Sequence, residues 1–420
     1  MATDLLRVGR RQFVLGLGAG FIMGAGGAAA YWRLKPASPV SSGATSALTT
    51  IDPNTIRRRG VGFRGYDPQR VSQGFTLFAP MTGPGIVYLM DIQGKVAHTW
   101  KMPYPPGLYG YLTDKGTLFY NGQIPNDTFI GKSPFMGGAA MEVDWNGKIL
   151  WELRQPDHHH EGRLLRNGNV LLLCSTELPA DVAKRVKGGL IGTEQGGGKI
   201  NGDYLVERTT GGKTVWEWRA WEHMEPEAYK ITSPSDARSE WTHGNGIAEL
   251  PDGNILVSFR NISTVVRINR QSRAIDWTLG APPLSGQHAP TPLPNGNILL
   301  FDNGPFRADT GVQPFSRALE INPNTNEIVW KYQDGTAPGS NHFFFSSRIS
   351  NAQRLPNGNT LINEGLYGRF FEVTAGGDVV WEYVNPHFGP PSSAPKGQTN
   401  NVFRAYRYTA DEVAAAQKMA

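Results

Sequence analysis

Histidines occur at three places in this chain beside other polar or charged residues. The first place is 157–161, Asp-His-His-His-Glu, the second is 241–245, Trp-Thr-His-Gly-Asn, and the third is 286–288, Gly-Gln-His. Near neutral pH an imidazole can act as a nucleophile or as a general acid or base. An isolated histidine in a strand more often only satisfies a nearby carbonyl. These residues therefore carry chemistry only if the fold brings them together.

Arg260 lies in the apolar segment that follows the second of these places, where its guanidinium could stabilise a developing oxyanion. A metal site is the competing interpretation, because clustered histidines bind zinc or copper. The sequence has no HExxH motif, and Cys174, its one cysteine, lies in the apolar run VLLLCST. The carboxylates that could join such a site are Asp157 and Asp302. We expect Cys174 to be a core residue.

A repeated pattern indicates how these residues are positioned. Six strand-like runs end in a tryptophan, at intervals of 51 to 65 residues: Trp100, Trp151, Trp216, Trp277, Trp330 and Trp381. Four of them are followed by turn motifs of the type LPNGN and then by an apolar strand. Repeats of this length, made of short strands and turns, are typical of radial all-β folds. The sequence predicts an all-β, six-bladed β-propeller in which the tryptophans pack between neighbouring sheets.

The repeat also predicts where the histidines lie. Five residues before the leucine that opens each turn motif stand His160, Asn245, His288 and Ser350. In a propeller this position belongs to the innermost strand, near the central axis. We therefore expect a set of polar residues to meet in one central funnel. This set is His159, His160, His243, Asn245 and His288.

The repeat also defines the domain boundaries. We expect a signal or anchor at 1–32, a flexible linker at 33–60, the propeller at 61–410 and a short helical tail at 411–420. Only closure of the ring removes both sheet edges, so strands from the two ends should share a blade. The segment 175–203 departs from the repeat. We expect it to be an insertion that could lie over the funnel as a lid.

The N-terminal segment resembles a twin-arginine export signal. Arg10-Arg11-Gln-Phe-Val-Leu precedes a weakly hydrophobic run rich in glycine and alanine. An uncleaved membrane anchor or another type of signal is the alternative. Residues 1–60 contain eight basic and two acidic residues, so the rest of the chain carries −1 of the total charge of +5. This balance argues against a nucleic-acid partner. We expect a periplasmic protein that meets the twin-arginine translocase during export.

The order of the motifs is similar to that of a known family. The histidine run, WTHGN, an arginine in the following strand, GQH and LLFDNG together resemble the bacterial arylsulfotransferase family (aryl-sulfate sulfotransferases) over roughly residues 70–408. The resemblance implies a six-bladed propeller that transfers a sulfuryl group from an aryl sulfate donor to a phenolic acceptor. It also implies a sulfated histidine intermediate and no nucleotide donor. We accordingly expect no cofactor.

The resemblance also implies roles for particular residues. The nucleophile position falls on His288, with His243, Asn245 and Arg260 around the sulfonate oxygens. The histidine that protonates the leaving phenolate falls on His159 or His160, and the sequence leaves this choice open. Sulfuryl transfer passes through a loose transition state, so cations and hydrogen-bond donors serve it well.

Two other functions stay open. Propellers host many unrelated activities, so a non-catalytic periplasmic protein that binds a ligand or another protein is one alternative. A metal- or quinone-dependent oxidoreductase is the other. The sequence also leaves open whether the protein is a homodimer.

Overall fold

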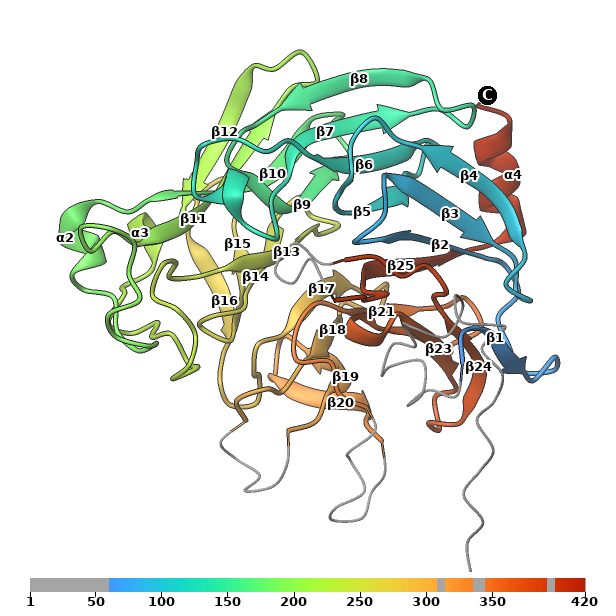
Figure 1. The fold of residues 1–420 in the computed structure, drawn as a ribbon. Coiled ribbons are helices and arrows are strands. Elements are labelled where there is room, and N and C mark those ends of the chain that lie inside the picture. The colour runs from blue at the N-terminus through green and yellow to red at the C-terminus, as the bar shows by residue number, and fades with distance from the viewer. Residues whose placement is uncertain (1–59, 308–313, 335–343, 391–396, 420) are drawn as a thin grey trace, which may run out of the picture. The chain divides into compact units, whose positions relative to one another are not determined.

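The repeated segments form six antiparallel sheets within the part of the chain that the structure describes. This computed structural model describes residues 60–307, 314–334, 344–390 and 397–419. The first strands of the sheets contact one another in a closed ring, which makes the sheets the blades of a six-bladed β-propeller (Figure 1). The predicted fold class is confirmed. The proposed export signal and linker lie outside the described residues, except for Gly60.

The blades are numbered along the chain, and their strands are given from the axis outward. Blade 1 contains β25 (Val402–Tyr408), β2 (Phe75–Pro80), β3 (Ile86–Met90) and β4 (Val96–Lys101). Blade 2 contains β5 (Pro106–Leu112), β6 (Leu118–Gln123), β7 (Gly138–Val143) and β8 (Ile149–Arg154). Blade 3 contains β9 (His158–Leu164), β10 (Val170–Glu177), β11 (Asn201–Arg208) and β12 (Thr214–Arg219).

The second half of the ring has the same order. Blade 4 contains β13 (Gly244–Glu249), β14 (Ile255–Phe259), β15 (Thr264–Ile268) and β16 (Ile275–Leu279). Blade 5 contains β17 (His288–Pro292), β18 (Ile298–Asp302), β19 (Arg317–Asn322) and β20 (Glu327–Tyr332). Blade 6 contains β21 (Asn351–Arg354), β22 (Thr360–Glu364), β23 (Arg369–Val373), β24 (Val379–Val384) and an additional outer strand, β1 (Gly62–Tyr66). Short helical segments are η1 (Ile130–Lys132), α2 (Ala180–Ala183), α3 (Ala220–His223) and η2 (Gly365–Tyr367).

Strands from both ends of the described chain complete the ring. β25 is the inner strand of blade 1 and pairs antiparallel with β2, with Tyr408 opposite Phe75. At the other end, β1 pairs with the outer strand of blade 6. Helix α4 (Ala410–Gln417) follows β25 and begins with a capping box of Thr409 and Glu412. The expectation that the two ends share a blade is confirmed, because β25 and β2 are neighbours.

Tryptophans in the fourth strands connect neighbouring blades. In five of the six repeats the indole N–H donates to the turn between the third and fourth strands of the next blade. The acceptors are Asp144 O for Trp100, Arg270 O for Trp216, Asn326 Oδ1 for Trp277, Ala375 O for Trp330 and Ile92 O for Trp381. Trp151 donates instead to Glu142 of its own blade. The tryptophans therefore space the blades, as the repeat predicts, and the bond from Trp381 joins blade 6 to blade 1.

The turn motifs have a role that the sequence did not reveal. In blade 5, Asn295 and Asn297 both donate to the carboxylate of Glu320, at 3.0 and 2.7 Å. Glu207 in blade 3 accepts from two asparagines in the same way, and Glu372 in blade 6 accepts from one, Asn359. An arginine of the next blade contacts each carboxylate: Arg354 for Glu320, Arg270 for Glu207 and Arg407 for Glu372. Each of these clamps, made of asparagine, glutamate and arginine, joins two blades.

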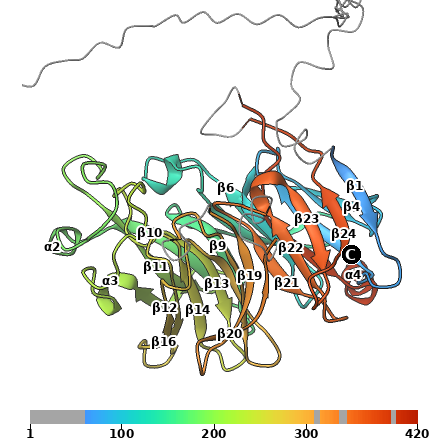
Figure 2. The ribbon, with the colours of Figure 1, turned by 90° about the horizontal axis from the view of Figure 1, so that it is seen from below.

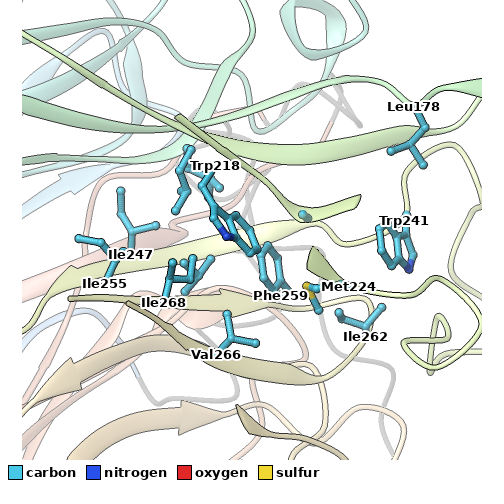
Figure 3. Close-up of a cluster of buried hydrophobic side chains, with 14 of the residues drawn as sticks. Leu178, Trp218, Met224, Trp241, Ile247, Ile255, Phe259, Ile262, Val266 and Ile268 are labelled. Atoms are coloured by element: carbon cyan, nitrogen blue, oxygen red, sulfur yellow. The ribbon is translucent and has the colours of Figure 1, made fainter. Parts of the chain in front are cut away.

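Apolar side chains fill the space between the blades. Between blades 3 and 4, the indole of Trp218 lies beside Phe259, with ring centroids 6.3 Å apart, and the cluster continues to Ile247 and Ile268 (Figure 3). Cys174 is buried in a similar cluster between blades 2 and 3, as expected. No helix in the described part of the chain is long and apolar enough to cross a membrane.

The insertion 175–203 does not lie over the funnel. Its helix α2 lies at the edge of the ribbon in both views (Figure 1, Figure 2). Gly188 and Leu190 form bridges with Ile231 and Ala237 of a later segment, and no residue of the insertion lines the central cavity. The interpretation as a lid is therefore not supported. The insertion instead pairs with the segment 231–240, which connects blades 3 and 4.

Candidate active site

One cavity at the centre of the ring collects side chains from several blades. It has a volume of about 520 Å³ and is lined by four of the residues singled out from the sequence: His160, His243, Arg260 and His288. Its wall also includes apolar side chains, among them Phe135 and Ile349. The blades thus bring together histidines that are up to 128 positions apart in the sequence. The wall thus combines imidazole and guanidinium groups with apolar side chains, which suits a molecule with an anionic group and a ring.

The inner strands are irregular where they reach this cavity. His160 and His243 have φ values of 52° and 49°, and Ile349 and Ser350 have φ values of 55° and 90°. Such left-handed conformations cost of order 1–3 kcal/mol for residues other than glycine. The ladders of β9, β13 and β17 also shift register near their cavity ends. Bulges of this kind redirect side chains, and here they accompany the histidines that face the cavity.

His288 is held by hydrogen bonds at both ring nitrogens. Its Nδ1 lies 2.7 Å from Oδ1 of Asn303 and 3.1 Å from the carbonyl oxygen of Gly286, and its Nε2 accepts the N–H of Ile349 at 3.0 Å. Because both partners of Nδ1 are acceptors, Nδ1 carries the proton and Nε2 holds the lone pair. Burial and the charge of Arg404 keep the pKa of His288 well below its usual range, against the opposing effect of Asn303. His288 is therefore neutral near pH 7.

His160 and His243 lie next to each other on the cavity wall. Their ring centroids are 4.7 Å apart, and Phe135 packs against both, stacked on His160 at 4.8 Å and edge-on to His243 at 4.7 Å. Nδ1 of His243 lies 2.8 Å from a carboxylate oxygen of Glu240. This contact favours a proton on Nδ1 of His243.

Two arginines give the cavity positive charge. Arg260 donates from Nη1 to Asp236 and to Asn261, both at 2.9 Å, which fixes its guanidinium at the wall. Arg348 lines the same cavity and is partly exposed. Burial, together with the charge of Arg260, lowers the pKa of Arg348 from its usual value. Two guanidinium groups that influence each other across one space favour an anionic ligand between them.

Two of the predicted site residues lie behind the wall and do not line the cavity. His159 is fully buried, with its Nε2 3.1 Å from a carboxylate oxygen of Asp203. Asn245 is also fully buried; its side-chain amide donates to the carbonyl of Gln287 at 2.9 Å, and its main-chain carbonyl accepts from Arg404 at 2.7 Å. Of the two adjacent histidines His159 and His160, it is therefore His160 that faces the cavity.

Sequence reasoning missed four residues around this site. These are Arg348 on the cavity wall, and Asp203, Glu240 and Asn303 behind the histidines. Arg348 stands two residues before Ser350, the polar residue at the repeated inner-strand position, and Asn303 belongs to the LLFDNG motif. The sequence positions of Arg348 and Asn303 could therefore have pointed to the site. Asp203 and Glu240 had no such signal, because the first ends an insertion and the second lies in an irregular segment.

No group of three or more His, Cys, Asp or Glu side chains among the residues of known placement is arranged to hold a metal ion. The cavity histidines instead contact a carboxylate, an amide and a second imidazole: Glu240 for His243, Asn303 for His288 and His159 for His160.

The fold and the cavity define the class of this protein: a six-bladed β-propeller with a central site of three imidazoles and two guanidinium groups. The family model described as "Arylsulfotransferase (ASST)" matches residues 66–285 and 283–414. The chain therefore belongs to the arylsulfotransferase family, and this membership supports aryl sulfotransfer, with an aryl sulfate donor and a phenol acceptor, as its general activity. No curated protein matches the chain.

Solved structures resemble the protein only weakly. A protein of unknown function from Bacteroides caccae is 14% identical with a TM-score of 0.45, covering 74% of this chain and 94% of that one. A streptogramin B lyase is 11% identical with a TM-score of 0.42, covering 83% and 93%. A virginiamycin B lyase from Staphylococcus aureus is 12% identical with a TM-score of 0.41, covering 78% and 85%.

Proposed function

We propose that this protein transfers a sulfuryl group from an aryl sulfate ester to a phenol through a covalent intermediate on His288. The observation that carries the proposal is the convergence of His160, His243, His288 and two arginines on one cavity in a member of this family. The donor's sulfonate would lie between Arg260 and Arg348, and its ring against the apolar wall. No nucleotide is needed, because an aryl sulfate already carries a phenolate leaving group.

In the first half-reaction, Nε2 of His288 attacks sulfur, the S–N bond forms and the aryl O–S bond breaks. The tautomer that Asn303 and Gly286 impose leaves the lone pair on Nε2, as this step requires. The hydrogen bond from Ile349 N–H to Nε2 has to open before the attack. Arg260 and Arg348 would balance the charge on the sulfonate oxygens, with His243 beside them. His160 would give a proton to the leaving phenolate.

In the second half-reaction, the acceptor phenol occupies the place of the first product. His160 takes the phenolic proton, the phenolate oxygen attacks sulfur and the S–N bond breaks. His288 then regains its lone pair. His160 therefore acts as acid and base in turn, which its position at the wall of the cavity permits.

The test combines turnover with mass spectrometry. With 4-nitrophenyl sulfate as donor, the wild-type protein should release nitrophenolate only when phenol is present, and donor alone should add one sulfuryl group to the peptide that contains His288. His288→Asn should lower kcat/KM by at least about 10³-fold and abolish the adduct. His98→Asn, in the outer strand β4, is the matched control and should retain activity. An adduct on the His243 peptide would show that His288 is not the nucleophile.

We also infer that the protein works in the periplasm after twin-arginine export, on the basis of the Arg10-Arg11 motif. Replacing both arginines with lysine should keep the protein in the cytoplasm, which cell fractionation measures. Unchanged export would contradict this inference.

A further inference from the structure

Behind His160 lies a second histidine and behind that an aspartate, in an unbroken line away from the cavity. Nδ1 of His160 lies 2.7 Å from Nδ1 of His159, and Nε2 of His159 lies 3.1 Å from Oδ1 of Asp203. His159 and Asp203 are buried, whereas His160 reaches the cavity. Nε2 of His160 makes no hydrogen bond with the residues of known placement and is the ring nitrogen left for a ligand.

The backbone of β9 is distorted in a way that makes this contact possible. Side chains of consecutive residues in a regular strand point to opposite faces of the sheet. His160 has a φ of 52°, and the register with β10 shifts between Leu172 and Cys174, opposite the segment that holds both histidines. The local distortion turns two consecutive imidazoles toward each other, at a cost in backbone energy that a packing role alone would not require.

Asp203 is fixed as an ionised acceptor. Its Oδ2 accepts from the hydroxyl of Thr242 at 2.6 Å and from the N–H of Gly244, which leaves Oδ1 for His159. Burial alone would raise the pKa of Asp203, but the contact with His159 and the two other donors outweigh burial and lower this pKa. The carboxylate therefore keeps its negative charge next to His159.

The two imidazoles have opposite electrostatic surroundings. The groups that face His160 besides His159 are His243, His288 and Arg404, and none of them is acidic. Burial and these neighbours hold the pKa of His160 well below its usual range. His159 has the Asp203 carboxylate on one side, and the other titratable group beside it, His158, is held neutral by burial, with a pKa of about 3. A positive charge on the pair is therefore nearer to a carboxylate when it lies on His159 than when it lies on His160.

We propose that Asp203, His159 and His160 form a proton relay, in which the proton exchanged with the phenol at Nε2 of His160 is stored on His159. In the acceptor half-reaction, Nε2 of His160 takes the phenolic proton while Nδ1–H of His160 passes its proton to Nδ1 of His159. His160 stays neutral, and His159 becomes an imidazolium beside the Asp203 carboxylate, which is not protonated itself. One proton enters the pair and no electrons are exchanged.

The donor half-reaction runs the relay in reverse. His159 returns its Nδ1 proton to Nδ1 of His160 as Nε2–H of His160 protonates the phenolate whose O–S bond breaks. In each full cycle, the histidine pair thus gives one proton to the donor's phenolate and takes one from the acceptor phenol. The relay rests on the proposed sulfuryl transfer, and it assigns positioning and proton-storage roles to His159 and Asp203, neither of which touches the substrate.

The experiment compares two donors that differ in their need for a proton. Nitrophenolate leaves 4-nitrophenyl sulfate without protonation, whereas the phenolate of phenyl sulfate belongs to a phenol whose pKa is about 10 and benefits from an acid. In Asp203→Asn, kcat/KM for phenyl sulfate should fall by about 10²-fold and kcat/KM for 4-nitrophenyl sulfate by less than about fivefold. Equal losses on both donors would indicate a purely structural role and overturn the relay.

His159→Gln separates proton storage from positioning. A glutamine amide can donate to Asp203 and accept from Nδ1–H of His160, so it can hold His160 in place, but it cannot store a proton. The relay predicts the same donor-selective loss as in Asp203→Asn, whereas recovery of activity on phenyl sulfate would overturn it. His158→Gln is the matched control, because His158 is equally buried and lies outside the line. This variant should change kcat/KM for both donors by the same factor.

A measurement without turnover tests the location of the proton directly. In protein labelled with ¹⁵N-histidine, NMR titration should show the pair taking up its first proton on His159, and Asp203→Asn should move this midpoint down by about one pH unit or more. Protonation of His160 first, or an unchanged midpoint, would overturn the relay. If the wild type transfers no sulfuryl group, the proposed function fails, and this titration still decides where the proton resides.

Discussion

At the scale of single residues, the feature that prepares His288 for chemistry is the amide of Asn303. The amide is held in one orientation because its Nδ2 donates to the carbonyls of Ser346 and Ile349, at 2.7 and 2.9 Å. Its Oδ1 must therefore face His288, where it can only accept a hydrogen bond. An amide whose two ends are distinguished in this way fixes the tautomer of its neighbour.

Replacing Asn303 with alanine should therefore impair catalysis more than binding. Without the acceptor, the proton of His288 can move to Nε2, the nitrogen that must attack. We expect kcat to fall by about 10- to 100-fold, as for other residues that orient a reacting imidazole, with a small change in KM. Steady-state kinetics with a good leaving group measures both constants.

The control for this variant is Asn363→Ala. Asn363 is also buried and also donates to two backbone carbonyls, those of Val402 and Phe403, but it has no contact with a histidine of the cavity. Asn363→Ala should lower the free energy of unfolding by a similar amount, without the loss in kcat. If the two variants lose kcat equally, Asn303 supports only the packing of the ring.

Residue types and register allowed the sequence to predict part of this site. His160 and His288 stand five residues before a turn leucine, and the structure places both on the cavity wall. Asn245 stands at the same position but lies behind the wall. A prediction from spacing holds only where strands are regular. Because the register of β13 shifts between Gly244 and Gly246, spacing alone does not predict where the side chain of Asn245 points.

At the scale of elements, the clamps between blades account for the repeated turn motif. In the clamp at Glu372, the carboxylate is fully buried and lies 3.3 Å from Arg407, which is itself buried and stacks on Trp381 at 4.5 Å. Burial lowers the pKa of Arg407 to about 10, although Glu372 acts in the opposite direction. A charge in such surroundings depends on its partner.

Glu372→Gln should accordingly destabilise the protein by about 3 kcal/mol, because it leaves the Arg407 guanidinium buried without its counter-charge. Thermal unfolding should show a lower Tm. The geometry of the active site should not change, because Glu372 does not line the cavity. Glu249→Gln provides the comparison, since Glu249 pairs with Arg166, which is half exposed, and such surface pairs contribute at most about 1 kcal/mol. Equal shifts in Tm for the two variants would show that the buried clamp contributes no more than a surface pair.

At the scale of the whole molecule, the period of the tryptophans was sufficient to predict six blades and their closure. It could not predict how the ends differ, because pairing across a ring depends on contacts between residues more than 300 positions apart. The structure makes β25 an inner, largely buried strand, whereas β1 is an outer strand with exposed residues. β25 also supplies Phe403 and Arg404, which lie behind the histidines of the cavity.

This asymmetry predicts different effects of truncation at the two ends. Removing residues 402–420 takes away the inner strand of blade 1 and exposes the ladder of β2, so the ring should open and the protein should aggregate or fail to fold. Removing β1, residues 60–66, together with everything before it, leaves blade 6 with four strands like the others, so the propeller should persist with a lowered Tm. Size-exclusion chromatography and circular dichroism of both truncated proteins measure the outcome. A folded monomer after loss of β25 would contradict the closure that its pairing with β2 provides.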